Sequence, residues 1–224
     1  MSSYDVFFDK QTHTYLVDGV ECPSVTDILA PLHRSYVKAN PSVLEYAANR
    51  GKAVHEALEA YDLGCELEAT PETAPYLQAY LDWGQVYKPT WVAVEKIVYN
   101  GDFCYGDYIG TVDRIGYFNG GKKLNVVDIK TSQATRESIT SACLQTYAYA
   151  AAYTKDEADR WVLFLKSDGT WRFQSCQEYE KKNGIIAWDC FGLLLRTRKM
   201  VDDLLRTGKR ITKGGVKNDS TDGL

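Results

Sequence analysis

Long apolar segments are missing from this sequence. No run of apolar residues approaches the ~18 that a membrane-spanning helix needs. The first ten residues, MSSYDVFFDK, have neither the basic start nor the apolar stretch of a secretion signal. We therefore expect a cytoplasmic protein that makes no contact with a membrane.

Closely spaced cysteines are also missing. The six cysteines, at positions 22, 65, 104, 143, 176 and 190, form no CxxC pair. Thiolate zinc sites and iron–sulfur sites usually have such short spacings. We therefore expect free thiols in a reducing compartment and no iron–sulfur cluster.

Overall positive charge, common among proteins that bind nucleic acids, is absent too, because the formal net charge is −4. The basic residues are instead concentrated near the end of the chain. Eight of them lie between Arg196 and Lys217, where only Asp202 and Asp203 oppose them. Such a local patch can hold phosphates on an acidic protein. A solvated helix face followed by a basic tail would explain the same charges equally well.

What the sequence does contain is typical of a globular protein. Hydrophobic residues make up 45% of the chain and charged residues 25%, which is ordinary for a packed domain. The 224 residues suit one domain, expected over 1–214, with a flexible tail at 215–224. Within it we expect an N-terminal hairpin and helical part at 1–88, a sheet core at 89–175 and a C-terminal helix at 176–210.

The spacing of apolar residues predicts the individual elements. We expect a hairpin at 4–20 and a short helix capped by Ser24. Further helices are expected at 42–63, where Arg50-Gly51 can divide the helix in two, and at 73–87, 137–153 and 184–206. Strands are expected at 90–99, 105–118, 123–130, 159–166 and 170–176. This order predicts an α/β domain whose central sheet is covered by helices on both faces.

Two acidic residues and a lysine are the clearest sign of chemistry. Asp113 ends the segment GTVD, and Asp128 and Lys130 lie in VVDIK on the neighbouring predicted strand. Because side chains alternate along a strand, Asp128 and Lys130 point to one face, and Val127 and Ile129 to the other. Converging carboxylates are costly to bury unless a cation neutralises them. Mg²⁺ or Mn²⁺ suits oxygen ligands and can activate water against a phosphate.

Lys130 would lie beside such a metal and the phosphate. There it can position the attacking water and stabilise developing charge, and a role as general base stays open. The alternative is a ladder of surface charges on an edge strand, because D-x-K is frequent by chance. The apolar neighbours Val126, Val127 and Ile129 favour a buried strand and therefore the catalytic interpretation.

Two predicted helices carry further candidates. His55, Glu59 and Asp62 share a stripe beside the apolar one, so His55 can offer an imidazole to the same metal. Gln145 and Tyr149 lie one turn apart and can hold a phosphate or a base. Taken alone, a surface histidine and a tyrosine-rich helix packed on a sheet are the simpler interpretations.

The order and spacing of these segments resemble a known family. RG-x3-H at 50–55, G-x2-D at 110–113, D-I-K at 128–130 and Q-x3-Y at 145–149 resemble the RecB-like branch of the PD-(D/E)XK nuclease superfamily. H-x-Y-x3-G at 13–19 and P-S-V-T-x-I-L at 23–29 are similar to phage exonucleases and the mitochondrial genome maintenance exonuclease. The resemblance covers roughly residues 11–150.

The resemblance implies a restriction-endonuclease-like core, with a central mixed β-sheet flanked by helices, and a helical arch from 24–87 that admits DNA ends. It implies Asp113, Asp128 and Lys130 as catalytic residues. It further implies metal binding by His55, Asp113, Asp128 and the backbone carbonyl of Ile129. Gln145, Tyr149 and Arg50 would bind substrate, and Glu95 and Glu59 are second-tier candidates.

The implied function is a Mg²⁺- or Mn²⁺-dependent DNA exonuclease that cuts from a free end and leaves 5′-phosphates. A phage-type role in recombination, repair or genome processing would place it in the host cytoplasm, with a single-strand annealing or recombination protein as a compatible partner. Three alternatives stay open: a non-catalytic DNA-binding or assembly subunit with a nuclease fold, a structure-specific endonuclease, and an unrelated α/β protein.

Overall fold

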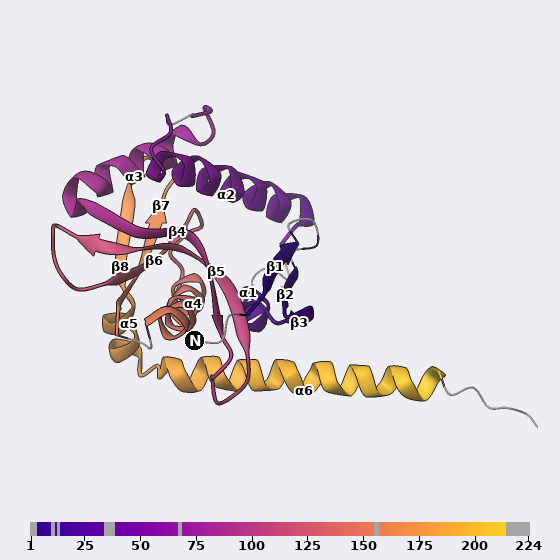
Figure 1. The fold of residues 1–224 in the computed structure, drawn as a ribbon. Helices are drawn as coiled ribbons and strands as arrows, with labels where there is room; N and C mark the ends of the chain where they lie inside the picture. The colour runs from indigo at the N-terminus through magenta and orange to yellow at the C-terminus, as the bar shows by residue number, and fades with distance from the viewer. Residues whose placement is uncertain are drawn as a thin grey trace, which may run out of the picture.

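The computed structural model describes residues 4–9, 12, 14–33, 39–66, 69–154 and 157–213, with side chains up to Leu205. Its helices and strands form two sheets and the helices around them (Figure 1). The elements are β1 Val6–Asp9, β2 Thr14–Val17, β3 Val20–Cys22, α1 Val25–Leu29, η1 Ala30–Leu32, α2 Pro41–Asp62, α3 Ala74–Tyr87, β4 Pro89–Asn100, β5 Tyr108–Phe118, β6 Asn125–Lys130, α4 Arg136–Thr154, β7 Asp159–Leu165, β8 Trp171–Ser175, α5 Cys176–Asn183 and α6 Ala187–Lys213. In the part of the chain so described, no helix is both long enough and apolar enough to cross a membrane.

The larger sheet has the strand order β4-β5-β6-β7-β8. All neighbouring pairs are antiparallel except β6 and β7, which run parallel because α4 carries the chain back between them. The predicted turn between β5 and β6 is confirmed: Asn119 and Gly120 have φ of 50° and 69°, the left-handed conformation that a tight hairpin requires. The sheet is therefore mixed, as expected.

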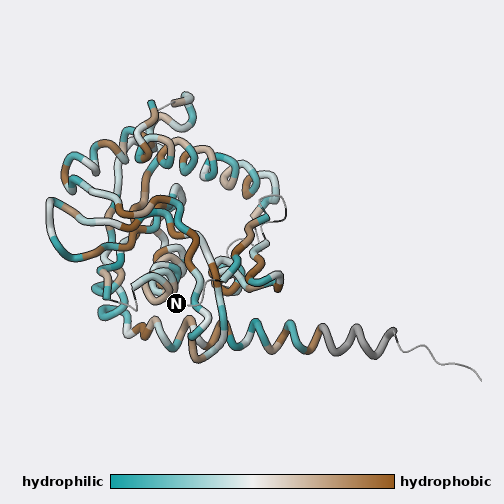
Figure 2. The backbone as a smooth tube through the Cα atoms, in the orientation of Figure 1, coloured by the Kyte–Doolittle hydropathy of each residue, from teal (hydrophilic) through white to brown (hydrophobic). Residues whose placement is uncertain are grey.

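Helices cover both faces of this sheet, which confirms the predicted layers. One face packs on α2 and α3 through a cluster that includes Trp83, Val127 and Ile129. The other face packs on α4 and α6 through a cluster that includes Val126 and Phe191. Figure 2 shows hydrophobic colour concentrated along the central strands, where both faces are covered.

The structure differs from the expected elements in three places. Arg50-Gly51 does not divide α2, which runs unbroken for 22 residues. Gly51 lies close to the loop after β6, because a Cβ there would be 3.3 Å from Thr131 Oγ1, a tight contact. The C-terminal segment is two helices rather than one, since Gly184, with φ of 63°, ends α5. The N-terminal hairpin gains a third strand, β3.

The small sheet is joined to the large one by local contacts. Ser24 caps α1 as predicted, its Oγ accepting a hydrogen bond of 3.0 Å from the Asp27 amide. Tyr15 Oη lies 2.9 Å from Thr111 Oγ1 on β5. α2 passes over β4 and β5 and reaches toward the small sheet (Figure 1), so its inner surface lies above the strands that carry Asp113 and Asp128.

Candidate active site

The site begins where two paired strands separate. β5 and β6 are in register from Gly116↔Asn125 to Arg114↔Val127, and the pairing ends there although both strands continue. Beyond this point the Asp113 carboxylate takes the place of a backbone acceptor, because its Oδ2 accepts a hydrogen bond of 2.6 Å from the Ile129 amide. A carboxylate is thus fixed between the strands, with 10% of its side chain exposed.

Asp128 and Lys130 face α4, as strand alternation predicts. Lys130 Nζ donates to Asp128 Oδ1 at 2.9 Å and to Gln145 Oε1 at 3.0 Å. Gln145 Nε2 in turn donates to Tyr149 Oη at 2.9 Å. Asp128 is fully buried. These four predicted residues therefore form one hydrogen-bonded chain from the sheet to the helix.

His55 and Glu95 approach from the side of α2 and β4. His55 Nε2 lies 3.0 Å from the Ile129 carbonyl oxygen, and its Nδ1 lies 3.8 Å from Glu95 Oε1 and 3.9 Å from Asp113 Oδ2. One ligand atom from each of these three side chains falls within 4.8 Å of the others. Glu95 has φ of 46°, an unusual conformation for a non-glycine residue in a strand. The tightest ligand group is thus His55, Glu95 and Asp113, with the Asp128–Lys130 pair beside it.

A buried arginine lies behind this group. Arg114 is inaccessible to water and donates through Nε to Asp62 Oδ2 at 2.6 Å and through Nη1 to Glu95 Oε1 at 2.9 Å. The same Nη1 lies 2.7 Å from the Asp113 carbonyl oxygen, and Tyr80 Oη donates to Asp62. Arg114 was not among the site residues predicted from the sequence. An arginine inside a strand of apolar residues is itself a signal, since a buried guanidinium needs partners.

The charges of the site do not cancel. Arg114 pairs with both Asp62 and Glu95, and Lys130 pairs with Asp128, so two side-chain cations face the four carboxylates of Asp62, Glu95, Asp113 and Asp128. Asp128 Oδ2 lies 2.8 Å from Lys130 Nζ, yet as a buried atom it accepts no hydrogen bond from the described residues. Oxygen-rich ligands, an imidazole and an excess of negative charge fit a divalent cation.

Titration of the site groups reflects this crowding. Burial raises the pKa of Asp128 to about 7, although the Lys130 ammonium lowers it. Burial lowers the pKa of His55, but the carboxylates of Asp113 and Glu95 outweigh burial and the pKa is raised overall. Burial also raises the pKa of the Tyr149 phenol well above its ordinary value, so Tyr149 stays a neutral partner of Gln145.

Some candidates lie away from the ligand group. Glu59 is not among the residues that the structure gathers there, and Arg50 lies on a different wall, described below. His13, of the opening motif, falls outside the described residues, as does the predicted tail at 215–224. The first part of the basic run is partly neutralised, because Arg198 Nε donates to Asp202 at 2.9 Å.

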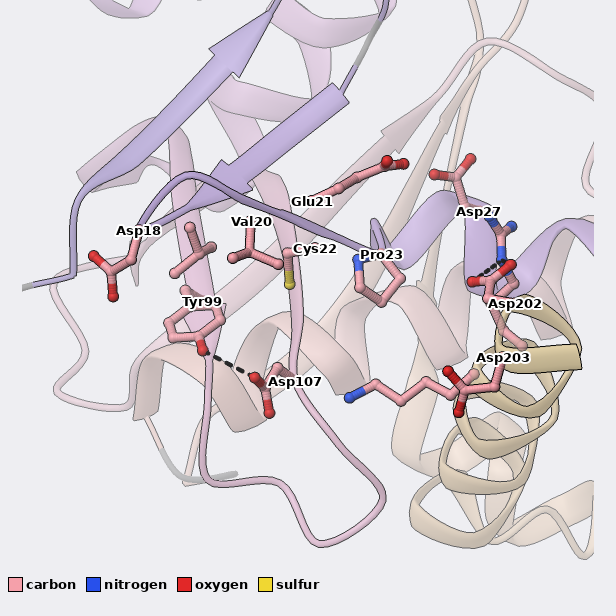
Figure 3. Close-up of a pocket in the computed structure, with 13 residues that line it drawn as sticks. Asp18, Val20, Glu21, Cys22, Pro23, Asp27, Tyr99, Asp107, Asp202 and Asp203 are labelled. Atoms are coloured by element: carbon pink, nitrogen blue, oxygen red, sulfur yellow. Dashed lines mark hydrogen bonds and ion pairs between the residues drawn. The ribbon is translucent and has the colours of Figure 1, made fainter. Parts of the chain in front are cut away.

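A separate cavity lies between the small sheet, α1, the β4–β5 loop and α6. Figure 3 shows that carboxylates dominate its lining, among them Asp27, Asp107, Asp202 and Asp203. It includes none of the side chains of the ligand group. Its six carboxylates outnumber the cations of Arg198 and Lys199, and such a charge disfavours phosphates.

Comparison with protein families decides the identity. A family model described as the PD-(D/E)XK nuclease superfamily matches residues 68–184. The chain belongs to the PD-(D/E)XK nuclease superfamily. Among curated proteins, none is significantly similar to the chain.

The matched segment of this PD-(D/E)XK nuclease runs from just before α3 to the end of α5. It contains Glu95, Asp113, Asp128 and Lys130, whereas His55 lies before it on α2. Nucleases of this superfamily generally use divalent metals and act on DNA, which agrees with the excess negative charge of the site. The restriction-endonuclease-like core expected from the sequence is confirmed.

Proposed function

We propose that this PD-(D/E)XK nuclease is a Mg²⁺- or Mn²⁺-dependent DNA exonuclease of the RecB-like branch, cutting from a free end and leaving 5′-phosphates. The observation that carries the proposal is the gap between β5 and β6. There Asp113, His55 and the Ile129 carbonyl converge, and Lys130 stands on the adjoining face. Phosphodiester hydrolysis needs a divalent cation, a positioned water and a cation near the phosphate, and these residues are suited to supply them.

Each residue then has a definite task. His55, Asp113, Asp128 and the Ile129 carbonyl would hold the metal, and Glu95 joins them as a ligand or through water. When bound, the metal acidifies a water and neutralises charge on the scissile phosphate. Lys130, held by Gln145 and by Asp128, positions that water and stabilises negative charge on the phosphate oxygens. Gln145 and Tyr149 keep the ammonium of Lys130 aimed at the reacting group.

The preference for free ends follows from α2. This helix crosses above β4 and β5 (Figure 1) and brings His55, which would bind the metal, to the Ile129 carbonyl on the face of the sheet opposite α4. In our proposal, residues 24–87 form an arch around the site, so that a strand is threaded by its end. The biological setting would be phage-type recombination, repair or genome processing in the host cytoplasm, with a single-strand annealing or recombination protein as partner.

The deciding experiment compares linear DNA with covalently closed circles, each single- and double-stranded, at equal protein concentration. We expect degradation of linear DNA with Mg²⁺ or Mn²⁺, none with a chelator, and at least about a hundredfold slower cutting of closed circles, because no end can enter the arch. An Asp113→Asn protein prepared in parallel controls for contaminating nuclease, since it removes one metal-binding charge.

Other outcomes separate the alternatives. Cutting of closed circles at the rate of linear DNA would make the protein an endonuclease. Metal-dependent DNA binding without cleavage would make it a non-catalytic subunit that retains the fold. Equal activity of the wild-type and Asp113→Asn proteins would overturn the site itself.

A further inference from the structure

A second polar cavity, of about 580 Å³, adjoins the proposed metal site. Three segments line it: Arg50 and Tyr76 from α2 and α3, the loop 131–135 that follows β6, and the β7–β8 turn at 165–168. The loop begins with the residue after Lys130. None of the metal-site carboxylates contributes to the lining. We refer to this cavity as the Arg50 pocket.

The guanidinium of Arg50 is held by aromatic rings. Its Cζ lies 5.3 Å from the centre of the Tyr76 ring and 5.8 Å from that of Tyr46. Within the described residues Arg50 makes no ion pair, and its Nε is buried without a hydrogen-bond acceptor. Stacking on rings orients a guanidinium but leaves its N–H donors unused. Arg50 is therefore a fixed cation with donors available for an anion.

The rest of the lining also favours an anion. Thr131 and Ser132 offer hydroxyl groups, and Lys166 adds a positive charge from the β7–β8 turn. Asp168 is the lone carboxylate of the lining, and its Oδ1 already accepts from the Thr170 amide at 2.9 Å and the Thr170 hydroxyl at 2.6 Å. Two cations against one engaged carboxylate leave a positive cavity, in contrast to the acidic one of Figure 3.

The position of the pocket indicates which anion it takes. Gly51 lies close to Thr131, so the α2 segment that bears Arg50 lies beside the end of β6, two residues beyond the Ile129 carbonyl, which His55 of the same helix contacts. A DNA strand whose scissile phosphate lies at the metal carries further phosphates on each side. Arginine is suited to grip such a phosphate through paired hydrogen bonds.

We propose that the Arg50 pocket binds a backbone phosphate of the cleaved DNA strand other than the one that is cut. This inference rests on the proposed nuclease function. It assigns to Arg50, Lys166 and the 131–132 hydroxyls the task of fixing the register of the strand, which sets where the scissile bond falls.

The test uses oligonucleotides that carry one uncharged methylphosphonate at successive positions. Binding is measured by fluorescence anisotropy with Ca²⁺ in place of Mg²⁺, after gels verify that the strands stay intact. For the wild-type protein we expect one non-scissile position to weaken binding roughly tenfold, the effect of losing one charged hydrogen-bonded contact. In Arg50→Gln that position should have no further effect, while the other positions keep theirs.

Controls keep the result interpretable. Arg172→Gln, which removes an exposed arginine on β8, should leave the wild-type profile unchanged. Should Arg50→Gln melt early, Lys166→Gln probes the same pocket from an exposed position on the β7–β8 turn and should weaken binding of the same phosphate. The slope of the logarithm of the binding constant against the logarithm of salt concentration should also become shallower by about one in Arg50→Gln.

Two results would overturn the inference: an Arg50→Gln profile that matches wild type, or an equal loss at every position. Failure of the proposed function looks different. If the wild-type protein cut no DNA with any divalent metal but still showed the position-specific effect, the pocket would stand and the nuclease assignment would fall.

Discussion

Two buried clusters of charge lie on the same sheet and are built in opposite ways. Arg160 of β7 meets Glu180 of α5 through two hydrogen bonds of 2.8 and 2.7 Å, and the Tyr147 ring centre lies 5.4 Å from its guanidinium carbon. The two side chains are only 6% and 9% exposed. Opposite charges are matched there in number and in geometry, as a structural ion pair requires.

In the cluster at the end of β6, opposite charges are matched neither in number nor in geometry. Two side-chain cations, Arg114 and Lys130, serve four carboxylates there, and Glu95 and Asp113 face His55 at 3.8 and 3.9 Å, too far for hydrogen bonds. Burial of charge therefore does not by itself distinguish a functional site from a structural one. The distinction lies in the uncompensated negative charge and the unfilled ligand positions, which together call for a cation.

The largest effect should come from Lys130→Met, which keeps an unbranched side chain, one atom shorter, and removes the ammonium. We expect cleavage of linear DNA to fall by about 10³-fold, because a cation beside the reacting phosphate contributes several kcal/mol to the transition state. Mn²⁺ binding, followed by calorimetry, should persist. Lys52→Met, at a lysine with 76% exposure on α2, is the matched control. A Lys130→Met rate within tenfold of wild type would remove lysine from the mechanism.

Removing one charge of the Arg160–Glu180 ion pair should instead lower stability and leave activity unchanged. Glu180→Gln leaves Arg160 buried without its counter-charge, which typically costs about 3–5 kcal/mol of unfolding free energy. Urea denaturation would measure this loss, with exposed Glu178→Gln as the control. Activity per folded molecule should stay at the wild-type level. A large loss of specific activity with little loss of stability would show that the two clusters are not separate in function.

Arg114 shares features of both clusters, since it is a buried structural cation and it also holds a carboxylate of the candidate site. Arg114→Lys keeps the charge but cannot contact Asp62, Glu95 and the Asp113 carbonyl together. Partners that orient metal ligands are typically worth about 10- to 100-fold in metal affinity, so Mn²⁺ should bind more weakly by that factor. Calorimetry without DNA measures it, and Arg172→Lys is the control. Affinity within twofold of wild type would limit Arg114 to a packing role.

The sequence was sufficient for the part of the site that depends on strand alternation. Asp128 and Lys130 are two residues apart and share a face. The Asn119-Gly120 turn brings Asp113 beside them. These are local rules, and the family of the chain followed from the same segments.

The remainder of the site depends on contacts that no local rule supplies. Glu95 has a positive φ within β4, and Arg114 meets Asp62 only because the end of α2 lies beside β5. The continuity of α2 through Gly51 was missed for the same reason. Glycine there serves the approach to Thr131, whereas its intrinsic tendency is to weaken a helix.

The smallest expected effect is a change in the pH dependence of stability, and it tests whether the site carries excess negative charge. In the metal-free protein, burial raises the pKa of Asp128 to about 7, whereas in the unfolded chain the pKa has its ordinary value of about 3.9. Between these values the folded state holds a proton that the unfolded state has lost, so stability falls as pH rises through this window. Asp128→Asn has no such proton, and Lys130, 29% exposed, can be solvated by water.

We therefore expect Asp128→Asn to be more stable than wild type at pH 8 in the presence of a chelator, by ~1–2 kcal/mol, although inactive. The advantage should shrink as pH falls through this window and vanish below about pH 3, where the wild-type carboxyl is neutral in both states. Thermal melts across this range measure the difference, and Asp102→Asn, at an exposed carboxyl of the β4–β5 loop, provides the baseline. If Asp128→Asn were instead less stable at pH 8, the Lys130 ammonium would already compensate Asp128. The excess charge that calls for a metal would then reside in Glu95 and Asp113 alone.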